Sequence, residues 1–145
     1  MEWTYKGELF TPDDLTPWLG FTYVITNLTN GKRYFGQKKF WSTRTKRVKG
    51  KKKKHKLESD WKEYWGSNLQ LQTDVKEIGS SNFTREILDL CERKGQMNYL
   101  ELRYQILHDV LLDANGFYND YVGARIHRKH LPIHPATSTS SAKLT

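Results

Sequence analysis

The order of hydrophobic and polar positions along the chain predicts three strands. FTYVITN, residues 21–27, is rich in β-branched and aromatic residues, as strands are. The Asn30-Gly31 pair that follows is a strong signal for a two-residue hairpin turn. GKRYFGQKKF, residues 31–40, then returns as the second strand, and FTREILDL, residues 83–90, is the third. The first two strands are therefore expected to form an antiparallel hairpin.

Two shorter segments have helical signals. SDWKEYWGSN predicts a short helix capped at Ser59 or Asp60, with Glu63 three residues after Asp60. A second helix is indicated by apolar residues at i, i+4 and i+7, and Gly79 stands where a helix-ending glycine belongs. Those apolar residues are Leu71, Val75 and Ile78.

The strongest helical pattern is NYLELRYQILHDVLLD. Asn98 is suited to cap its start, and Asn115-Gly116 is suited to end it. One apolar stripe runs along it at i, i+4, i+7 and i+11, formed by Leu100, Tyr104, Leu107 and Leu111. A stripe of this kind predicts a helix that packs against the sheet.

These elements predict a small α+β fold, a three-stranded mixed or antiparallel sheet flanked by helices. Residues 1–20 contain several aromatics and turn formers, so we expect a packed N-terminal arm there. Residues 21–131 are expected to form the domain itself, with a basic insertion at 44–56. Residues 132–145 have few apolar side chains and are expected to be disordered.

Charge is concentrated in one segment. The net charge is +8, and RTKRVKGKKKKHK, residues 44–56, holds nine of the 24 lysines and arginines and no acid. The remaining 15 basic residues are balanced by 16 acidic ones. We expect a long loop here, after a short helical stretch, that contacts the phosphate backbone of a nucleic acid. A solvated loop or an import-like basic run is the alternative.

The single cysteine and the hydropathy of the chain indicate the compartment in which the protein works. Cys91 has no second cysteine to pair with, which fits a reducing compartment, and its place at a strand end suggests a buried structural thiol. No long apolar run or signal peptide pattern is present, so no membrane is expected. We expect a cytoplasmic protein.

The predicted hairpin brings two tyrosines to one face. With a two-residue turn at Asn30-Gly31, partners have numbers that sum to 61, so Tyr23 would face Lys38 and Asn27 would face Tyr34. Tyr23 and Tyr34 then share a face, and Gly36 leaves a gap between them. Such aromatics commonly cover a core, and they are also suited to an active site.

The stretch TYVITNLTNGKRYFG resembles the paired motif of the GIY-YIG nuclease family. Tyr23 matches the tyrosine of the first motif, where Phe21-Thr22-Tyr23 replaces Gly-Ile-Tyr, and Tyr34-Phe35-Gly36 matches the second. GSNLQLQTDVKEIGSSNFTREILDLCE is similar to the segment that follows the family's second helix. The resemblance covers about residues 20–125 and is to the catalytic module of phage Seg-like homing endonucleases.

The resemblance implies an endonuclease that uses Mg²⁺ or Mn²⁺ to hydrolyse DNA. It implies Tyr23 as the base, supported by Tyr34, and Glu101 as the metal ligand. Arg44 lies ten residues after Tyr34, near where the family places an arginine on its first helix, and would bind the scissile phosphate. Asn119 would orient the phosphate or ground the site.

One position departs from the family pattern. The family often has a histidine or tyrosine one turn after the arginine, where this chain has Val48. Tyr64 and His55 are candidates to replace it. The expected DNA-binding side chains are Lys38, Lys39, Arg47, Lys51, Lys52, Lys53, Lys54, Arg125 and Arg128, of which Arg47, Lys38 and Lys39 could also supply the charge expected of Arg44.

Two other functions use the same fold. A non-catalytic DNA-binding protein would not need Glu101, whereas a structure-specific nuclease would prefer branched over linear DNA. The sequence leaves open whether the protein is a monomer or a homodimer.

Overall fold

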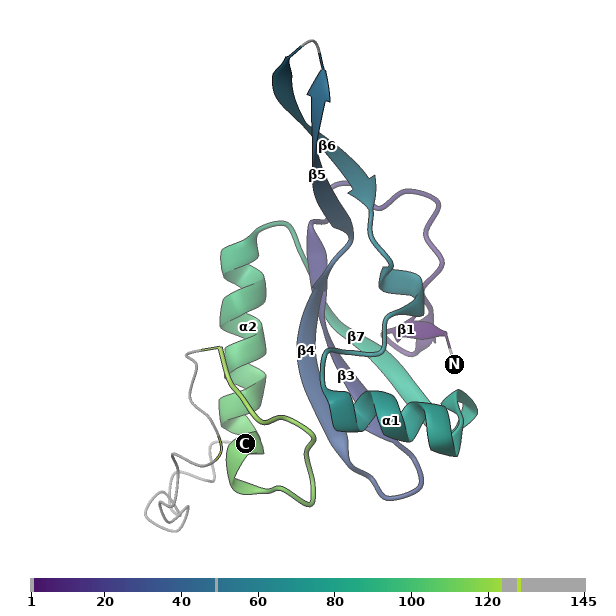
Figure 1. Cartoon of the computed structure of the whole chain (residues 1–145). Helices are drawn as coiled ribbons and strands as arrows, with labels where there is room; N and C mark the ends of the chain where they lie inside the picture. The colour runs from purple at the N-terminus through teal and green to yellow at the C-terminus, as the bar shows by residue number, and fades with distance from the viewer. Residues whose placement is uncertain (1, 49, 124–127, 129–145) are drawn as a thin grey trace.

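The computed structural model describes residues 2–48, 50–123 and 128, with the backbone alone described for 44–48 and 51–55. A five-stranded mixed sheet in the order β2-β1-β7-β3-β4 forms the body of the molecule (Figure 1). The strands of this sheet are β1 (Trp3–Tyr5), β2 (Glu8–Leu9), β3 (Gly20–Asn27), β4 (Arg33–Lys39) and β7 (Phe83–Cys91). β1 runs parallel to β7, and the other pairs are antiparallel.

The prediction of a three-stranded sheet was therefore wrong in number. The three predicted strands are present as β3, β4 and β7, and β3 lies between the other two. The extra strands, β1 and β2, come from the N-terminal arm. They contain three and two residues, too few for an alternating pattern to be recognised. β1 joins the sheet through backbone hydrogen bonds to β7, which is distant in sequence.

The β3–β4 hairpin is shorter by one pair than predicted. Tyr23 pairs with Gly36 and Ile25 with Tyr34, so partners have numbers that sum to 59. The backbone amide of Asn27 bonds the carbonyl of Lys32, which leaves four residues in the loop. Because the shift is two residues, it leaves every side chain on the predicted face. Tyr23 and Tyr34 therefore do share a face.

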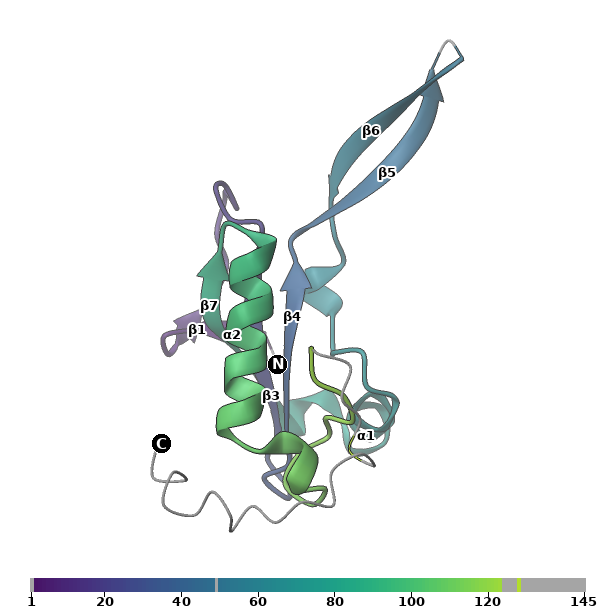
Figure 2. The ribbon, with the colours of Figure 1, turned by 90° about the vertical axis from the view of Figure 1, so that its left-hand side faces the viewer.

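Residues 41–58 form a second hairpin, not the expected long loop after a helical stretch. β5 (Trp41–Val48) pairs antiparallel with β6 (Lys51–Glu58) over their whole length. Gly50 lies at the turn with φ of 77°, a conformation that glycine adopts without strain. Figures 1 and 2 both show this ribbon projecting away from the body. Hydrophobic alternation could not predict it, because nearly every position is polar.

The helices lie close to their predicted places, but both ends of the long helix differ from the prediction. The segment at 59–68 contributes only a 3₁₀ turn, and Gly79 ends the second helix as expected. The long helix begins at Lys94 and not near Asn98, because Arg93 and Gln96 form a capping box. It ends at Leu107, so the stripe is interrupted before Leu111. The helical elements are η1 (Trp61–Glu63), α1 (Leu69–Ile78), η2 (Ser80–Asn82), α2 (Lys94–Leu107) and η3 (Val110–Leu112).

Each face of the sheet carries its own core. α2 and η3 cover one face, where Val24 and Phe35 pack with Val110 and Phe117. The other face packs against η1 and α1. Its buried side chains are Trp3, Leu15, Phe21, Tyr23, Ile25, Phe40, Trp61, Leu71, Phe83, Ile87 and Tyr118. β4 is an edge strand of the sheet, so side chains from the layers on the two faces can meet beside it.

Two further expectations concern Cys91 and membrane spans. Cys91 ends β7, is buried and is unpaired, as predicted. Burial also raises the pKa of its thiol, which makes it a poor nucleophile. Within the residues that the structure describes, no helix is both long and apolar enough to cross a membrane. The tail at 132–145 lies outside the described residues.

Candidate active site

Tyr23 crosses the sheet toward its edge over a glycine. The side chain is 1% exposed, and it points across Gly36, its partner on β4. A Cβ atom on Gly36 would lie 2.6 Å from Cζ of Tyr23, closer than real Cβ atoms approach. The tyrosine can take this path only because residue 36 has no side chain.

Two more tyrosines gather around Tyr23. The Tyr34 ring lies 6.2 Å from it, and the Tyr64 ring meets it edge-on at 6.0 Å, both measured between ring centroids. The Tyr34 hydroxyl shares a 3.0 Å hydrogen bond with Oγ of Ser67. Three tyrosine rings, from β3, β4 and the segment before α1, thus pack together. The sequence could not show this, because Tyr64 is distant from the other two tyrosines along the chain.

Both tyrosines of the paired motif are protonated at neutral pH. Burial raises the pKa of Tyr23 well above its usual value, and the nearby Tyr34 and Tyr64 raise it further. Burial also raises the pKa of Tyr34, although the hydrogen bond with Ser67 opposes this. Each hydroxyl is therefore a hydrogen-bond donor before any substrate or cation arrives.

Glu101 reaches this edge from α2, on the other layer. Nε2 of Gln37 donates to Oε1 of Glu101 at 2.8 Å, and the same nitrogen donates to Asn98. Nζ of Lys94 donates to Oε1 of Gln37 at 2.6 Å. Burial raises the pKa of the Glu101 carboxyl, and the Gln37 hydrogen bond and the Lys94 charge act against that. The carboxyl is thus half-buried and held at one oxygen.

The charge of Glu101 acts on both tyrosines. Burial is the main cause that raises the pKa of Tyr23 and of Tyr34, and the charge of Glu101 adds to it in both cases. Among the residues that the structure describes, no cluster of three or more metal-ligating side chains exists. One carboxylate beside phenol hydroxyls fits a hard cation such as Mg²⁺, which takes one or two carboxylates and completes its shell with water and phosphate.

Asn119 is buried against the strand that carries Tyr34. It accepts from the amide of Phe35 at 3.1 Å and donates to the carbonyl of the same residue at 2.8 Å. Both ends of its amide are therefore engaged with β4. The segment continues this contact, because Tyr118 donates its amide to the carbonyl of Arg33.

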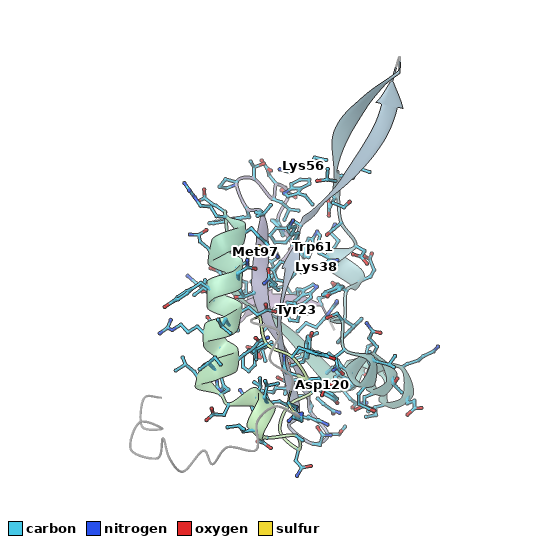
Figure 3. The ribbon with its side chains drawn as sticks, turned by 60° about the vertical axis from the view of Figure 1, so that its left-hand side comes forward. Tyr23, Lys38, Lys56, Trp61, Met97 and Asp120 are labelled. Atoms are coloured by element: carbon cyan, nitrogen blue, oxygen red, sulfur yellow. The ribbon has the colours of Figure 1, made fainter. Side chains whose placement is uncertain are left out.

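Lys38 supplies a positive charge on the tyrosine face. Its Nζ lies 4.2 Å from the centre of the Tyr64 ring and 2.7 Å from Oδ1 of Asp60. Lys38 shares its face of β4 with Tyr34 and Gly36, since alternate residues point the same way. In Figure 3, Lys38 lies beyond Tyr23 in the direction of the projecting hairpin.

An open hollow of about 690 Å³ begins at Lys38. β4, the base of the β5–β6 hairpin and the start of α2 surround it. Lys38, Lys39 and Lys94 line it, together with Glu58 and Asp60. The hollow therefore borders both the tyrosine face, through Lys38, and the Glu101 network, through Lys94.

A family model described as "Putative endonuclease segE, GIY-YIG domain" matches residues 3–122. The chain belongs to this SegE GIY-YIG family. It is also similar to the "Putative endonuclease segE" of Enterobacteria phage T4, with 29% identity over 99 residues. That match includes 68% of this chain and 39% of the relative, so the chain spans well under half of the relative's length. No solved structure matches the chain.

The match places the N-terminal arm within the family domain. It begins at residue 3, where β1 begins, whereas the sequence motifs alone indicated a resemblance from about residue 20. β1 and β2 are therefore part of the SegE GIY-YIG domain as well as of its sheet.

The predicted basic residues divide between the body and the hairpin. Arg44 and Arg47 lie on β5, and the four lysines at 51–54 lie on β6. Arg44 pairs with His55 across the hairpin, so its backbone is in a strand and not in the helix that the resemblance implied. Val48 ends the same strand. Of the predicted basic residues, Lys38 lies over the Tyr64 ring. The backbone of the hairpin residues belongs to the projecting ribbon.

The remaining predicted residues lie near the C-terminal end of the described chain. Arg128 donates to the carbonyls of Leu111 and Asn119 and lies 3.6 Å from Asp120. These contacts fix the segment that carries Asn119. Arg125 lies outside the described residues.

Sequence reasoning missed three residues of this cluster or gave them little weight. Gln37 holds Glu101, Ser67 holds Tyr34, and Tyr64 packs on Tyr23. The sequence offered Tyr64 as a substitute for the family histidine or tyrosine, and not as a partner of Tyr23. Gln37 lies between Gly36 and Lys38 on β4 and points to the opposite face of the sheet. Nothing in its position marks it as the partner of Glu101, which is 64 residues away.

Proposed function

We propose that this chain is a DNA endonuclease that hydrolyses phosphodiester bonds with the help of Mg²⁺ or Mn²⁺, in the manner of phage homing endonucleases. Membership of the SegE GIY-YIG family supports a nuclease. The T4 relative, which is named as an endonuclease, supports the same activity. The expected place of action is the cytoplasm of a phage-infected cell.

One observation carries the proposal. Tyr23 and Tyr34 meet beside Gly36 on the edge strand β4, and Glu101 comes to the same strand from the opposite layer. A purely structural tyrosine pair has no need of a half-buried carboxylate beside it. Strongly perturbed groups gathered from three elements are typical of an active site.

The reaction adds water across a phosphodiester bond. The oxygen of water bonds to phosphorus, the bond from phosphorus to the leaving oxygen breaks, and that oxygen takes up a proton. Tyr23 and Tyr34 are protonated donors that can orient the water and the phosphate, and Tyr23 is proposed to pass a proton on as the water attacks. Asn119 holds β4 through its two hydrogen bonds to Phe35 and so supports the position of Tyr34.

Glu101 is proposed to hold the metal through the carboxylate oxygen that Gln37 leaves free. A bound divalent cation would polarise the phosphate and lower the pKa of water and hydroxyl groups near it. Gln37 and Lys94 keep the carboxylate oriented toward the edge of β4.

The β5–β6 hairpin is proposed to contact the DNA backbone. Thirteen of its residues, 44–56, hold nine basic residues and no acid. Arg44, Arg47 and the lysines at 51–54 lie on a two-stranded ribbon of a kind that fits a DNA groove. Lys38 and Lys39 continue the positive charge into the body.

A non-catalytic DNA-binding protein is the second candidate. The observation in its favour is that Arg44 stands on a projecting strand, so it cannot be assigned to the tyrosine site from its backbone. A nuclease for branched DNA is a variant of the first proposal, distinguished by its substrate.

Supercoiled plasmid incubated with the protein tests the proposal. Wild-type protein, Glu101→Gln and the matched control Glu77→Gln would each be assayed with and without Mg²⁺. Glu77 is exposed on α1, so its substitution changes the same charge far from the tyrosines. We expect cleavage that needs both Mg²⁺ and Glu101 and that survives in the control.

Each other outcome has a defined meaning. Salt-sensitive retardation of DNA with no cleavage of plasmid, phage genomic or branched DNA would favour the binding protein. Cleavage confined to branched DNA would identify the structure-specific nuclease. Open-circle product indicates one cut per encounter, and linear product indicates a second copy or rebinding.

A further inference from the structure

The proposed reaction needs a positive group beside the tyrosines. Charge develops on the phosphate oxygens in the transition state, and a fixed cation that meets this charge contributes strongly to catalysis. The backbone of Arg44, the residue first expected in this role, belongs to the ribbon that extends beyond the end of β4 (Figure 2). The source of the charge has therefore to be sought among the side chains at the edge of the sheet.

Lys38 is the lysine that the structure orients over this cluster. Its Nζ lies 4.2 Å from the centre of the Tyr64 ring, and the Tyr64 ring packs on Tyr23. Its side chain is only 20% exposed, so its stem is held while its amine reaches the hollow. Gly36 and Tyr34 precede it on the same face of β4.

We propose that Lys38 is the phosphate-binding catalytic cation of this site, held in readiness by Asp60 and Tyr64. The proposal rests on the nuclease function proposed above. It assigns to a strand lysine the role that was expected of an arginine in a helix. Tyr64, considered earlier as a substitute for a missing family residue, then orients this lysine.

The other lysines of the hollow are less suited to the role. Lys39 follows Lys38 on the strand, so it points to the opposite face, and it is exposed. Lys94 donates to Gln37 and so serves the Glu101 network. Of these three side chains, Lys38 is the one that lies over a ring of the cluster, that of Tyr64.

The partner of Lys38 suits an exchange with substrate. Asp60 holds Nζ at 2.7 Å, but its own side chain is 72% exposed. An ion pair of that exposure contributes little to stability, so a phosphate can replace the carboxylate as the partner of the lysine. Lys38 lowers the pKa of Asp60 through their hydrogen bond, so the carboxylate stays charged and holds the amine until DNA arrives.

The test compares Lys38→Met with Lys38→Arg in the plasmid cleavage assay with Mg²⁺. Methionine keeps a long stem over the Tyr64 ring and removes the charge. Lys32→Met is the matched control, because Lys32 lies over the Tyr118 ring at 4.7 Å, near the far end of the β3–β4 hairpin. Thermal unfolding and DNA retardation by each variant would show that folding and binding persist.

We expect Lys38→Met to slow cleavage by about 10²- to 10³-fold, as the loss of one transition-state donor does. Binding should weaken less than about tenfold, since one phosphate contact among several is lost. Lys38→Arg should restore most of the rate, and Lys32→Met should match wild type.

One result would overturn the assignment while leaving the nuclease proposal intact: a wild type that cuts and a Lys38→Met variant that cuts at a rate within threefold of it. Loss of cleavage in Arg44→Met at the same time would assign the role to Arg44. Absence of any cleavage by the wild-type protein would instead overturn the nuclease function on which the assignment rests.

Discussion

At the scale of single residues, Gly36 determines whether the tyrosines can meet. A methyl group there would overlap the end of the Tyr23 ring, which is fully enclosed and cannot move aside. We predict that Gly36→Ala lowers the free energy of unfolding by about 1–3 kcal/mol, the usual cost of an overpacked core, and abolishes cleavage. Denaturant unfolding and plasmid cleavage would measure both effects.

Gly95→Ala is the control for this change. Gly95 lies in α2, and a Cβ added there meets nothing within 4 Å. Because alanine is favoured over glycine in a helix, this variant should be stabilised by about 0.5–1 kcal/mol and keep its activity. A tolerated alanine at position 36 would contradict the described path of Tyr23.

Protonation of the Glu101 carboxyl should determine the pH below which activity is lost, the acid limit of activity. Burial raises its pKa above the usual value, and only the charged form can hold a cation. Activity should therefore fall, as pH decreases, at a higher pH than an exposed glutamate would give. Gln37→Leu removes the hydrogen bond that lowers this pKa and should move the limit further up.

The pH dependence of kcat/KM measures this limit. Gln70→Leu is the control, because Gln70 bonds only within α1 to Asp74 in its described contacts. The same raised pKa has a consequence for stability: the folded protein holds the proton more tightly, so this group's contribution to stability declines as pH rises through that range. An acid limit unchanged in Gln37→Leu would argue against Glu101 as the group that titrates.

At the scale of elements, the β5–β6 hairpin is expected to be separable from the body. Ser42 and Leu57 are opposite one another, so an Asn-Gly turn can join them in place of residues 43–56. This change removes nine positive charges and takes the net charge from +8 to about −1. We predict a thermal midpoint within a few degrees of wild type and much weaker binding to DNA.

The salt dependence of binding measures the role of the hairpin. Each lost phosphate contact should reduce the slope of log K against log salt by about 0.9. A variant with glutamine at the four lysine positions 51–54 keeps the ribbon and removes only charge, so it should lose part of the same slope. Equal binding by wild type and both variants would show that DNA contacts lie elsewhere.

At the scale of the whole molecule, the N-terminal arm holds the segment that carries Tyr64. Trp3 on β1 is buried and donates its indole N–H to the carbonyl of Trp61 at 2.8 Å. Arg85 on β7 stacks on Trp3 and donates to the carbonyls of Lys62 and Tyr64. The arm, the sheet and the segment before α1 are thus interlocked.

Trp3→Phe tests this arrangement. It removes one of the two hydrogen bonds to the Trp61 carbonyl, which keeps the Tyr64 amide, and it removes part of a large buried ring. We therefore predict a loss of about 2–4 kcal/mol in the free energy of unfolding. Trp18→Phe, at a partly exposed position, should cost less. Chemical denaturation of both variants makes the comparison, and a cost below about 0.5 kcal/mol for Trp3→Phe would contradict an arm that is integral to the core.

The local elements and the chemistry of the chain were predictable from the sequence. β-Branched runs and an Asn-Gly turn marked β3, β4 and β7, and apolar spacing marked α1 and most of α2. The paired tyrosine motif led to the family, which the comparison confirms. These features depend on neighbours within a few residues, so they are visible in the order of residues alone.

Only the tertiary structure decided how those elements meet. β1 and β2 joined the sheet, the basic segment became a ribbon, and Lys38, Tyr64 and Gln37 came to the edge where Tyr23 and Tyr34 lie. Each of these results depends on pairing or packing between segments far apart in the chain. The sequence thus determined the local elements and the residue types available for catalysis. Backbone pairing and side-chain packing between distant segments determined which of these residues lie together.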